Sequence, residues 1–201
     1  MNTVWNVPNQ LTVARLVLSG LCFICLAFDN YLFGLILFAI AAGTDWVDGF
    51  WARRYGQITQ LGRILDPFAD KIVICGTFIF LAAVPPTVSG RSASEIMAWM
   101  AVVVVARELL VTALRSMAEG QGSDFSAQWA GKWKMVVQCA AAAASLWRLW
   151  YYGYKSATWA TPPPDWTSWL LRILVWFAVL LTIYSAWGYV QSAFRMLKKS
   201  D

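Results

Sequence analysis

The sequence predicts an all-α polytopic membrane protein, a bundle of six transmembrane helices in a single domain over residues 1–201. Hydrophobic residues make up 59% of the chain, and the mean hydropathy is +0.54. Charged residues make up 13%, about half the usual share in a soluble domain. The apolar runs are long and continuous, without the alternation of barrel strands. Because a water-soluble domain could not bury this much apolar surface, soluble and disordered classes are excluded.

Six apolar stretches approach the roughly 20 residues that span a bilayer core as a helix: residues 11–28, 31–54, 62–84, 95–118, 132–150 and 167–190. The first ends at a predicted tight turn, residues 29–30, and a short polar link, residues 55–60, follows the second. A loop with two prolines and a glycine, residues 85–90, separates the third from the fourth. Residues 119–126 form a polar loop, and residues 161–165 carry three consecutive prolines before the last helix.

The distribution of Lys and Arg predicts the orientation of the bundle. With six crossings and a cytoplasmic N-terminus, twelve of the 16 basic residues lie on or border the cytoplasmic side. We therefore expect a multi-pass protein of the cell (inner) membrane with both termini in the cytoplasm. The net charge of +5 then reflects topology and contact with anionic membrane lipids. No basic run interleaved with aromatic residues points to nucleic-acid binding.

The chain contains no histidine. This excludes His general bases, Ser-His and Cys-His nucleophiles and His metal ligands. Any chemistry must therefore rest on carboxylates, Lys and Arg, hydroxyl groups, or metal ions held by oxygen.

Four aspartates stand at the facing ends of the second and third predicted helices. Asp45 and Asp48 are three residues apart, and Asp66 and Asp70 are four apart, so each pair lies on one helix face. The short link makes the two helices antiparallel neighbours, which directs both pairs toward one site. Four carboxylates this close repel one another unless cations intervene, and Mg²⁺ or Mn²⁺ with oxygen ligands suits them. Ionisable residues at membrane depth are candidates for function.

Small residues surround these carboxylates. Gly49, Ala52 and Gly62 lie one helical turn or less from an aspartate, where a large side chain would block a ligand. Glycine inside a helix costs roughly 1 kcal/mol relative to alanine, so their presence indicates the close approach of another group. That group is either a ligand or a tightly packed neighbouring helix.

The pattern Asp45-x2-Asp48-Gly49-x2-Ala52-Arg53-x8-Gly62-x3-Asp66-x3-Asp70 resembles the full signature of the CDP-alcohol phosphatidyltransferase family. The resemblance implies transfer of a phosphatidyl group from CDP-diacylglycerol to an alcohol, with release of CMP. It implies that the four aspartates hold two divalent cations, Mg²⁺ or Mn²⁺, and that Asp70 is also the general base. Gly49, Ala52, Arg53 and Gly62 would shape the nucleotide pocket. The family resemblance also suggests a homodimer.

Three further stretches, residues 8–15, 107–115 and 129–138, resemble the family members whose acceptor is glycerol 3-phosphate. The first places Asn9, Thr12 and Arg15 at the start of the first helix, where we expect Asn9 and Thr12 to help bind CDP-diacylglycerol. The other two supply a basic group suited to the acceptor phosphate: Arg107, Arg115, Lys132 and Lys134. For Lys132 and Lys134 an alternative is ordinary positive flanking of a transmembrane helix.

Several alternatives remain at the level of sequence. Within the family, a second basic group would also suit phosphatidylglycerol as acceptor, as in a cardiolipin synthase, and less well serine or inositol phosphate. From other classes, the aspartates could form the transit site of a divalent-cation transporter, or an acidic face that docks a partner. The transporter needs carboxylates along a path near the bilayer midplane, whereas here they cluster beside a cytoplasmic link.

Overall fold

The computed structural model describes the backbone of residues 7–55, 60–88, 90–120 and 129–200, and the side chains of residues 10–44, 68, 69, 71–88, 90–117, 131 and 133–191. The described residues form six helices and one short hairpin: α1 (Val7–Ala27), α2 (Tyr31–Tyr55), α3 (Gln60–Ala83), α4 (Ala98–Gly120), α5 (Trp129–Tyr151), β1 (Tyr154–Lys155), β2 (Thr158–Trp159) and α6 (Asp165–Ser200). The predicted all-α class and its six helices are confirmed.

Four predicted helix boundaries differ from the structure by three residues or more. The first helix begins at Val7 instead of residue 11, and the fifth begins at Trp129 instead of residue 132. The fourth helix begins at Ala98 instead of residue 95, because Glu95 has a φ of 58°, which is incompatible with a right-handed helix. The last helix continues past residue 190 to Ser200. The end of its apolar run is not the end of the helix, because residues 191–200 contain no glycine or proline to stop it.

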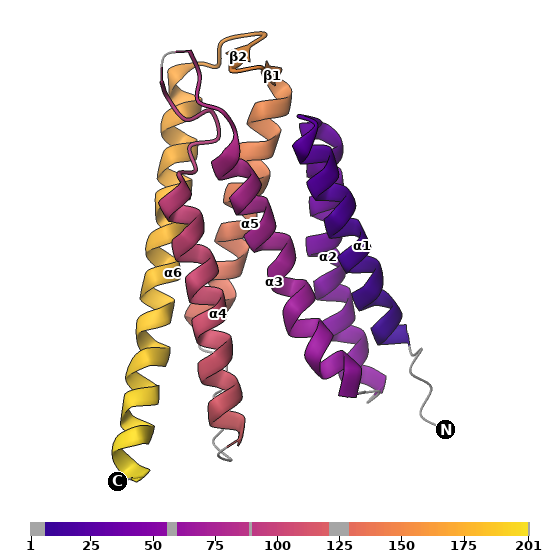
Figure 1. Cartoon of the computed structure of the whole chain (residues 1–201), viewed down its shortest axis with the longest axis vertical. Coiled ribbons are helices and arrows are strands. Elements are labelled where there is room, and N and C mark those ends of the chain that lie inside the picture. Colours follow the sequence, from indigo (N-terminus) through magenta and orange to yellow (C-terminus); the bar gives the residue numbers. More distant parts are fainter. Residues whose placement is uncertain (1–6, 56–59, 89, 121–128, 201) are drawn as a thin grey trace.

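The helices form two groups that converge at one end of the molecule (Figure 1). Helix α1 packs on α2 and α3, while α6 packs on α4 and α5. Contacts of α2 with α5 and of α3 with α4 join the groups. The groups lie close together near the hairpin and separate toward the end where α1 begins and α6 ends. Helix α2 ends and α3 begins at this open end.

Each helix contributes to a common apolar core, with side chains at most 2% exposed: Cys22, Phe38, Phe78, Met100, Leu146 and Val175. The outward face of α6 is also apolar, with Leu170, Ile173, Phe177 and Leu180 all more than half exposed at helical spacing. Such a continuous exposed patch is unfavourable in water and suits contact with lipid chains.

Two helices of the described part of the chain are long and apolar enough to cross a bilayer by length and composition, over Gln10–Ala27 and Asp165–Gln191. Shorter apolar helical stretches occupy Tyr31–Thr44 and Lys71–Ala83. The first of these stretches ends, and the second begins, next to an aspartate whose side chain is outside the described set.

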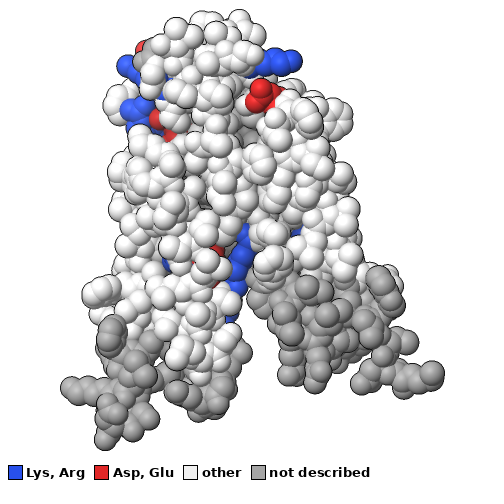
Figure 2. All heavy atoms as spheres, viewed as in Figure 1, with Lys and Arg blue, Asp and Glu red and all other residues white. Residues whose placement is uncertain are grey.

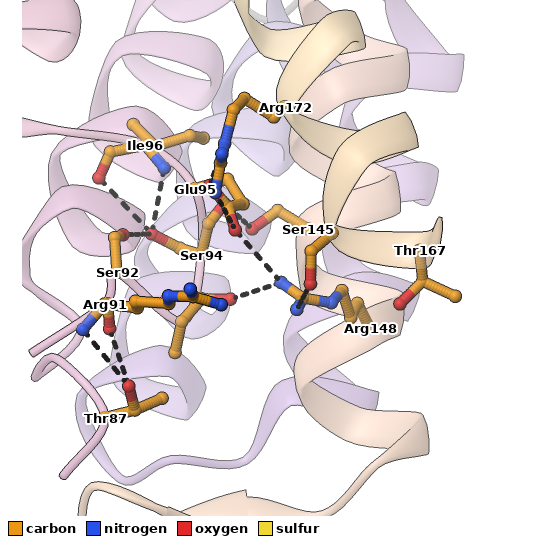
Figure 3. A network of polar contacts seen from close by, with 12 residues as sticks. Thr87, Arg91, Ser92, Ser94, Glu95, Ile96, Ser145, Arg148, Thr167 and Arg172 are labelled. Atoms are coloured by element: carbon orange, nitrogen blue, oxygen red, sulfur yellow. Dashed lines mark hydrogen bonds and ion pairs between the residues drawn. The ribbon is translucent and has the colours of Figure 1, made fainter. Parts of the chain in front are cut away.

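A buried polar network closes the end of the bundle near the hairpin (Figure 3). Glu95, in the loop between α3 and α4, accepts a 3.0 Å hydrogen bond from Arg172 Nε of α6. Arg148 Nη1 of α5 donates to Ala93 O at 3.0 Å, and Ser145 Oγ donates to Ser94 O at 2.9 Å. Because the loop is bonded to two helices at once, it fixes the start of α4 against α5 and α6.

The β1–β2 hairpin adds to this closed end, and the sequence did not predict it. Tyr154 pairs with Trp159, and the turn residues Ser156 and Ala157 both have positive φ, as a two-residue hairpin loop requires. The Tyr154 hydroxyl donates to the carbonyl of Pro85 in the α3–α4 loop. The hairpin thus connects the α5–α6 segment to the loop that precedes α4.

Candidate active site

The four aspartates lie on the two helices that the sequence predicted for them. Asp45 and Asp48 belong to the last turns of α2, and Asp66 and Asp70 to the first turns of α3. Both helix segments lie at the open end of the bundle (Figure 1). The side chains of these aspartates are outside the described set, so the expected convergence of the carboxylates stays a prediction.

The residues expected around the nucleotide are described only in part. Thr12 of α1 is buried, with 2% of its surface exposed. The side chains of the other five residues expected at the nucleotide site are outside the described set: Asn9, Gly49, Ala52, Arg53 and Gly62. Their helices, α1, α2 and α3, pack against one another.

Arg15 lies buried where α1, α2, α3 and α5 meet. Its neighbours around a small cavity include Ala41 and Ala42 of α2 and Val73 and Ile74 of α3. Ala41 and Ala42 precede Asp45 by one helical turn, and Val73 and Ile74 follow Asp70 by one turn. The sequence placed Arg15 with the polar start of the first helix, and the structure places it directly beneath the acidic segments of α2 and α3.

A buried ionic triad joins α4 to α5. Arg107 Nη1 lies 3.4 Å from both carboxylate oxygens of Glu108, and Lys134 Nζ donates to Glu108 Oε1. All three residues are at most 8% exposed. The structure therefore brings together Arg107 and Lys134, which the sequence assigned to the acceptor phosphate, and it shows that Glu108 connects them. The Lys132 side chain is outside the described set.

Helix α6 extends this arrangement to Arg115. Arg107 Nε donates to Ser185 Oγ at 3.1 Å, and Arg115 Nη2 donates to Tyr189 Oη at 3.1 Å. Gln138 Nε2 of α5 donates to Thr182 Oγ1 at 2.7 Å. Sequence reasoning missed these α6 residues. The signal was present, because Thr182, Ser185 and Tyr189 recur at helical spacing within an otherwise apolar helix.

The electrostatics of this region favour an anion. Arg107, Arg115 and Lys134 carry three positive charges, and Glu108 supplies one negative charge among their described contacts. Buried charges are normally paired, so the excess positive charge favours a negatively charged ligand. Figure 2 shows a hollow between the two groups of helices at the open end, with Lys and Arg atoms at its inner end.

Among the described side chains, no three His, Cys, Asp or Glu residues form a cluster suited to a metal ion. The four aspartates predicted to hold metal ions are not among these described side chains. The donor set that they offer, carboxylate oxygen without sulfur or imidazole, is the one that Mg²⁺ and Mn²⁺ prefer. The residues present therefore fit the metals that the sequence implies.

Comparisons with known proteins identify the family of this chain. The CDP-alcohol phosphatidyltransferase family model matches residues 5–184. A CDP-diacylglycerol–glycerol-3-phosphate 3-phosphatidyltransferase of Bacillus subtilis (strain 168) is 32% identical over 98% of this chain and 100% of its own length. Enzymes of the same name from Haemophilus influenzae and Shigella flexneri are 32% and 33% identical, and each alignment covers 94% of this chain. The chain belongs to the CDP-alcohol phosphatidyltransferase family of membrane enzymes.

Proposed function

We propose that this protein transfers the phosphatidyl group of CDP-diacylglycerol to sn-glycerol 3-phosphate, giving phosphatidylglycerophosphate and CMP. Family membership supports the phosphatidyl transfer, and the near full-length similarity to enzymes named for this acceptor supports glycerol 3-phosphate. The observation that carries the acceptor is the buried excess of positive charge around Glu108, because it suits an acceptor that bears a phosphate.

The acidic segments of α2 and α3 supply the reaction centre. Asp45, Asp48, Asp66 and Asp70 would hold two divalent cations, which would neutralise the diphosphate of the substrate and the departing CMP. Mg²⁺ and Mn²⁺ both fit these carboxylates. Asp70 also acts as the general base, since neighbouring carboxylates and low dielectric favour proton uptake by a carboxylate.

The transfer is one displacement at phosphorus. The primary hydroxyl oxygen of glycerol 3-phosphate forms a bond to the phosphatidyl phosphorus. The bond from that phosphorus to the CMP oxygen breaks, and CMP leaves with the bonding electrons. The hydroxyl proton passes to the carboxylate of Asp70.

The remaining polar residues bind the two substrates. Gly49, Ala52 and Gly62 would leave space for the nucleotide, and Arg53 would bind the diphosphate, with Asn9 and Thr12 completing the CDP-diacylglycerol site. Arginine suits this role because its planar guanidinium donates two parallel hydrogen bonds to a phosphate. The acceptor phosphate binds at the basic group: Arg107, Arg115, Lys132 and Lys134.

We further propose that residues 1–201 form one membrane domain whose six helices all cross the inner membrane. The excess of basic residues toward the open end supports a cytoplasmic location for this end and for both termini. Glycerol 3-phosphate and CMP then enter and leave through the hollow of Figure 2. By analogy with the family, two copies of the chain form a homodimer.

An acceptor panel tests the proposal. The purified full chain is incubated with labelled CDP-diacylglycerol and Mg²⁺, and with glycerol 3-phosphate, phosphatidylglycerol, serine or inositol phosphate in turn. We expect CMP release and labelled phosphatidylglycerophosphate with glycerol 3-phosphate, and neither product when EDTA is added. Turnover only with phosphatidylglycerol would identify a cardiolipin synthase instead. Metal uptake into liposomes without CMP release would identify a transporter.

A further inference from the structure

One face of α6 contacts the acceptor site along its length. Thr182, Ser185 and Tyr189 lie three and four residues apart on this face, and all three are at most 2% exposed. They contact Gln138, Arg107 and Arg115 respectively. Every contact joins residues distant in sequence, so α6 is in a position to control the geometry of side chains on α4 and α5.

Tyr189 contacts both arginines of the basic group. The guanidinium carbons of Arg107 and Arg115 each lie 5.8 Å from the centroid of its ring, within the range of a cation–π interaction. Its hydroxyl also accepts the 3.1 Å hydrogen bond from Arg115 Nη2. Because two guanidinium groups repel each other, a shared aromatic ring offsets their repulsion while no anion is bound.

Ser185 fixes the orientation of Arg107. Its hydroxyl donates to the Thr182 carbonyl at 2.9 Å, so its hydrogen is used and its oxygen is oriented to accept from Arg107 Nε at 3.1 Å. Glu108 holds Nη1 of the same guanidinium. Among the described residues, the buried Arg115 Nε has no hydrogen-bond partner, so Arg115 keeps a donor for an anion.

Tyr189 also lies against the start of α5. A Cβ atom on Gly131 would lie 3.6 Å from Tyr189 Oη, which is ordinary van der Waals contact. Gly131 stands one helical turn before Lys134, so the tyrosine hydroxyl lies against the segment that carries this lysine. The ring is therefore packed between α4 and α5.

We propose that Ser185 and Tyr189 are positioning residues of the acceptor site, which hold the guanidinium groups of Arg107 and Arg115 in the arrangement that binds the phosphate of glycerol 3-phosphate. The proposal rests on the function proposed above. Holding these groups in place before binding lowers the ordering cost that the ligand would otherwise meet. Neither residue touches the reacting atoms, so their effect falls on acceptor binding.

Steady-state kinetics of the full-length enzyme test this role. Tyr189→Phe removes the acceptor of the Arg115 hydrogen bond and keeps the ring, while Ser185→Ala removes the acceptor of the Arg107 bond. For each we expect the KM for glycerol 3-phosphate to rise roughly tenfold, the size typical of a lost hydrogen bond to a charged group. The kcat and the KM for CDP-diacylglycerol should stay within about twofold. Tyr189→Leu, which also removes the ring, should raise the acceptor KM further.

Tyr184→Phe is the matched control. Tyr184 lies on the same helix and is 70% exposed, so this substitution also removes a tyrosine hydroxyl but leaves the acceptor site untouched. It should leave every kinetic constant unchanged. A second readout is the rise in melting temperature of metal-loaded protein on addition of glycerol 3-phosphate. This rise should shrink in Tyr189→Phe and Ser185→Ala and persist in the control.

The outcomes separate the two proposals. If the unmodified enzyme does not use glycerol 3-phosphate at all, the proposed function is wrong. If it does use it, but Tyr189→Phe and Ser185→Ala keep the original acceptor KM, the positioning role alone is wrong. A fall in kcat with an unchanged acceptor KM would also overturn the positioning role. If Tyr189→Leu fails to fold, Tyr189→Phe and Ser185→Ala still test whether Ser185 and Tyr189 position the two arginines.

Discussion

Replacing Glu108 by glutamine tests whether the acceptor site carries more positive than negative charge. The substitution removes the one carboxylate that contacts both Arg107 and Lys134 in the described structure, at nearly constant volume. Two cations then remain buried beside a neutral amide. We expect the folded protein to lose stability, and we expect an added anion to restore more stability in the variant than in the original protein.

The magnitude follows from burial. Glu108 is 7% exposed and Lys134 is 4% exposed, so solvent screens the pair weakly. Removing one partner of a buried ion pair costs about 3–5 kcal/mol. For a chain of this length, each kcal/mol shifts the melting temperature by about 2–4 °C, which predicts a loss of roughly 6–20 °C. The substitution raises the summed charge of residue 108, Arg107, Lys134 and Arg115 by one. Glycerol 3-phosphate or inorganic phosphate should therefore bind the variant more tightly.

Tryptophan fluorescence of the detergent-solubilised protein during a thermal ramp measures both effects, with and without glycerol 3-phosphate. Glu95→Gln is the control, because Glu95 is an equally buried carboxylate that contacts Arg172 and Arg148 at the opposite end. It should lower the melting temperature without changing the ligand-induced rise. Two results would contradict this prediction. One is a melting temperature of Glu108→Gln equal to that of the original protein. The other is a rise in melting temperature with glycerol 3-phosphate that is no larger in Glu108→Gln than in Glu95→Gln.

Three further predictions concern the reaction centre and the packing. Asp70→Asn should abolish CMP release while the protein still elutes as a folded species in size-exclusion chromatography; substantial turnover would exclude Asp70 as the base. EDTA should abolish activity, and Mg²⁺ or Mn²⁺ in excess should restore it; activity that resists exhaustive chelation would contradict the metal assignment. Gly76→Ala should lower stability by about 1–3 kcal/mol in thermal unfolding, because the new Cβ atom would overlap the ring of Phe23. Phe23→Leu in the same chain should restore part of that loss, and a full-stability Gly76→Ala variant would show that α1 and α3 are not packed as described.

The six helices could be predicted because each depends on a local property, a long apolar run between polar breaks. The residue at which α4 begins could not be predicted from such local properties. Its position depends on the left-handed backbone of Glu95, which is held by a hydrogen bond from Arg172, 77 residues further along the chain. The β1–β2 hairpin was missed for a related reason, since its turn residues Ser156 and Ala157 are not the Asn-Gly or Gly-Gly pairs that usually signal such a turn.

In the candidate site too, some residues could be predicted from the sequence and others depend on contacts between distant parts of the chain. Arg107 and Lys134 could be assigned to one basic group because each is a cation in or beside an apolar run. Ser185 and Tyr189 recur at helical spacing, but this pattern alone does not assign them to the basic group, because single hydroxyl groups are common in transmembrane helices and carry no charge signal. Their role depends on contacts with Arg107 and Arg115 that are 78 and 74 residues away in the chain. Only the folded arrangement of α4 against α6 makes those contacts visible.

The closed end of the bundle has a consequence for the permeability of the membrane. Along α4, α5 and α6, the polar level of Glu95, Arg148 and Arg172 is separated from the level of Arg107 and Lys134 by fully buried apolar side chains: Val104, Ala142 and Val179. This layer offers no polar path between the two levels of these three helices. In the orientation proposed above, a water-soluble acceptor would reach a lipid-borne donor from one side of the membrane, and these three helices would provide no leak for protons or ions to the other side.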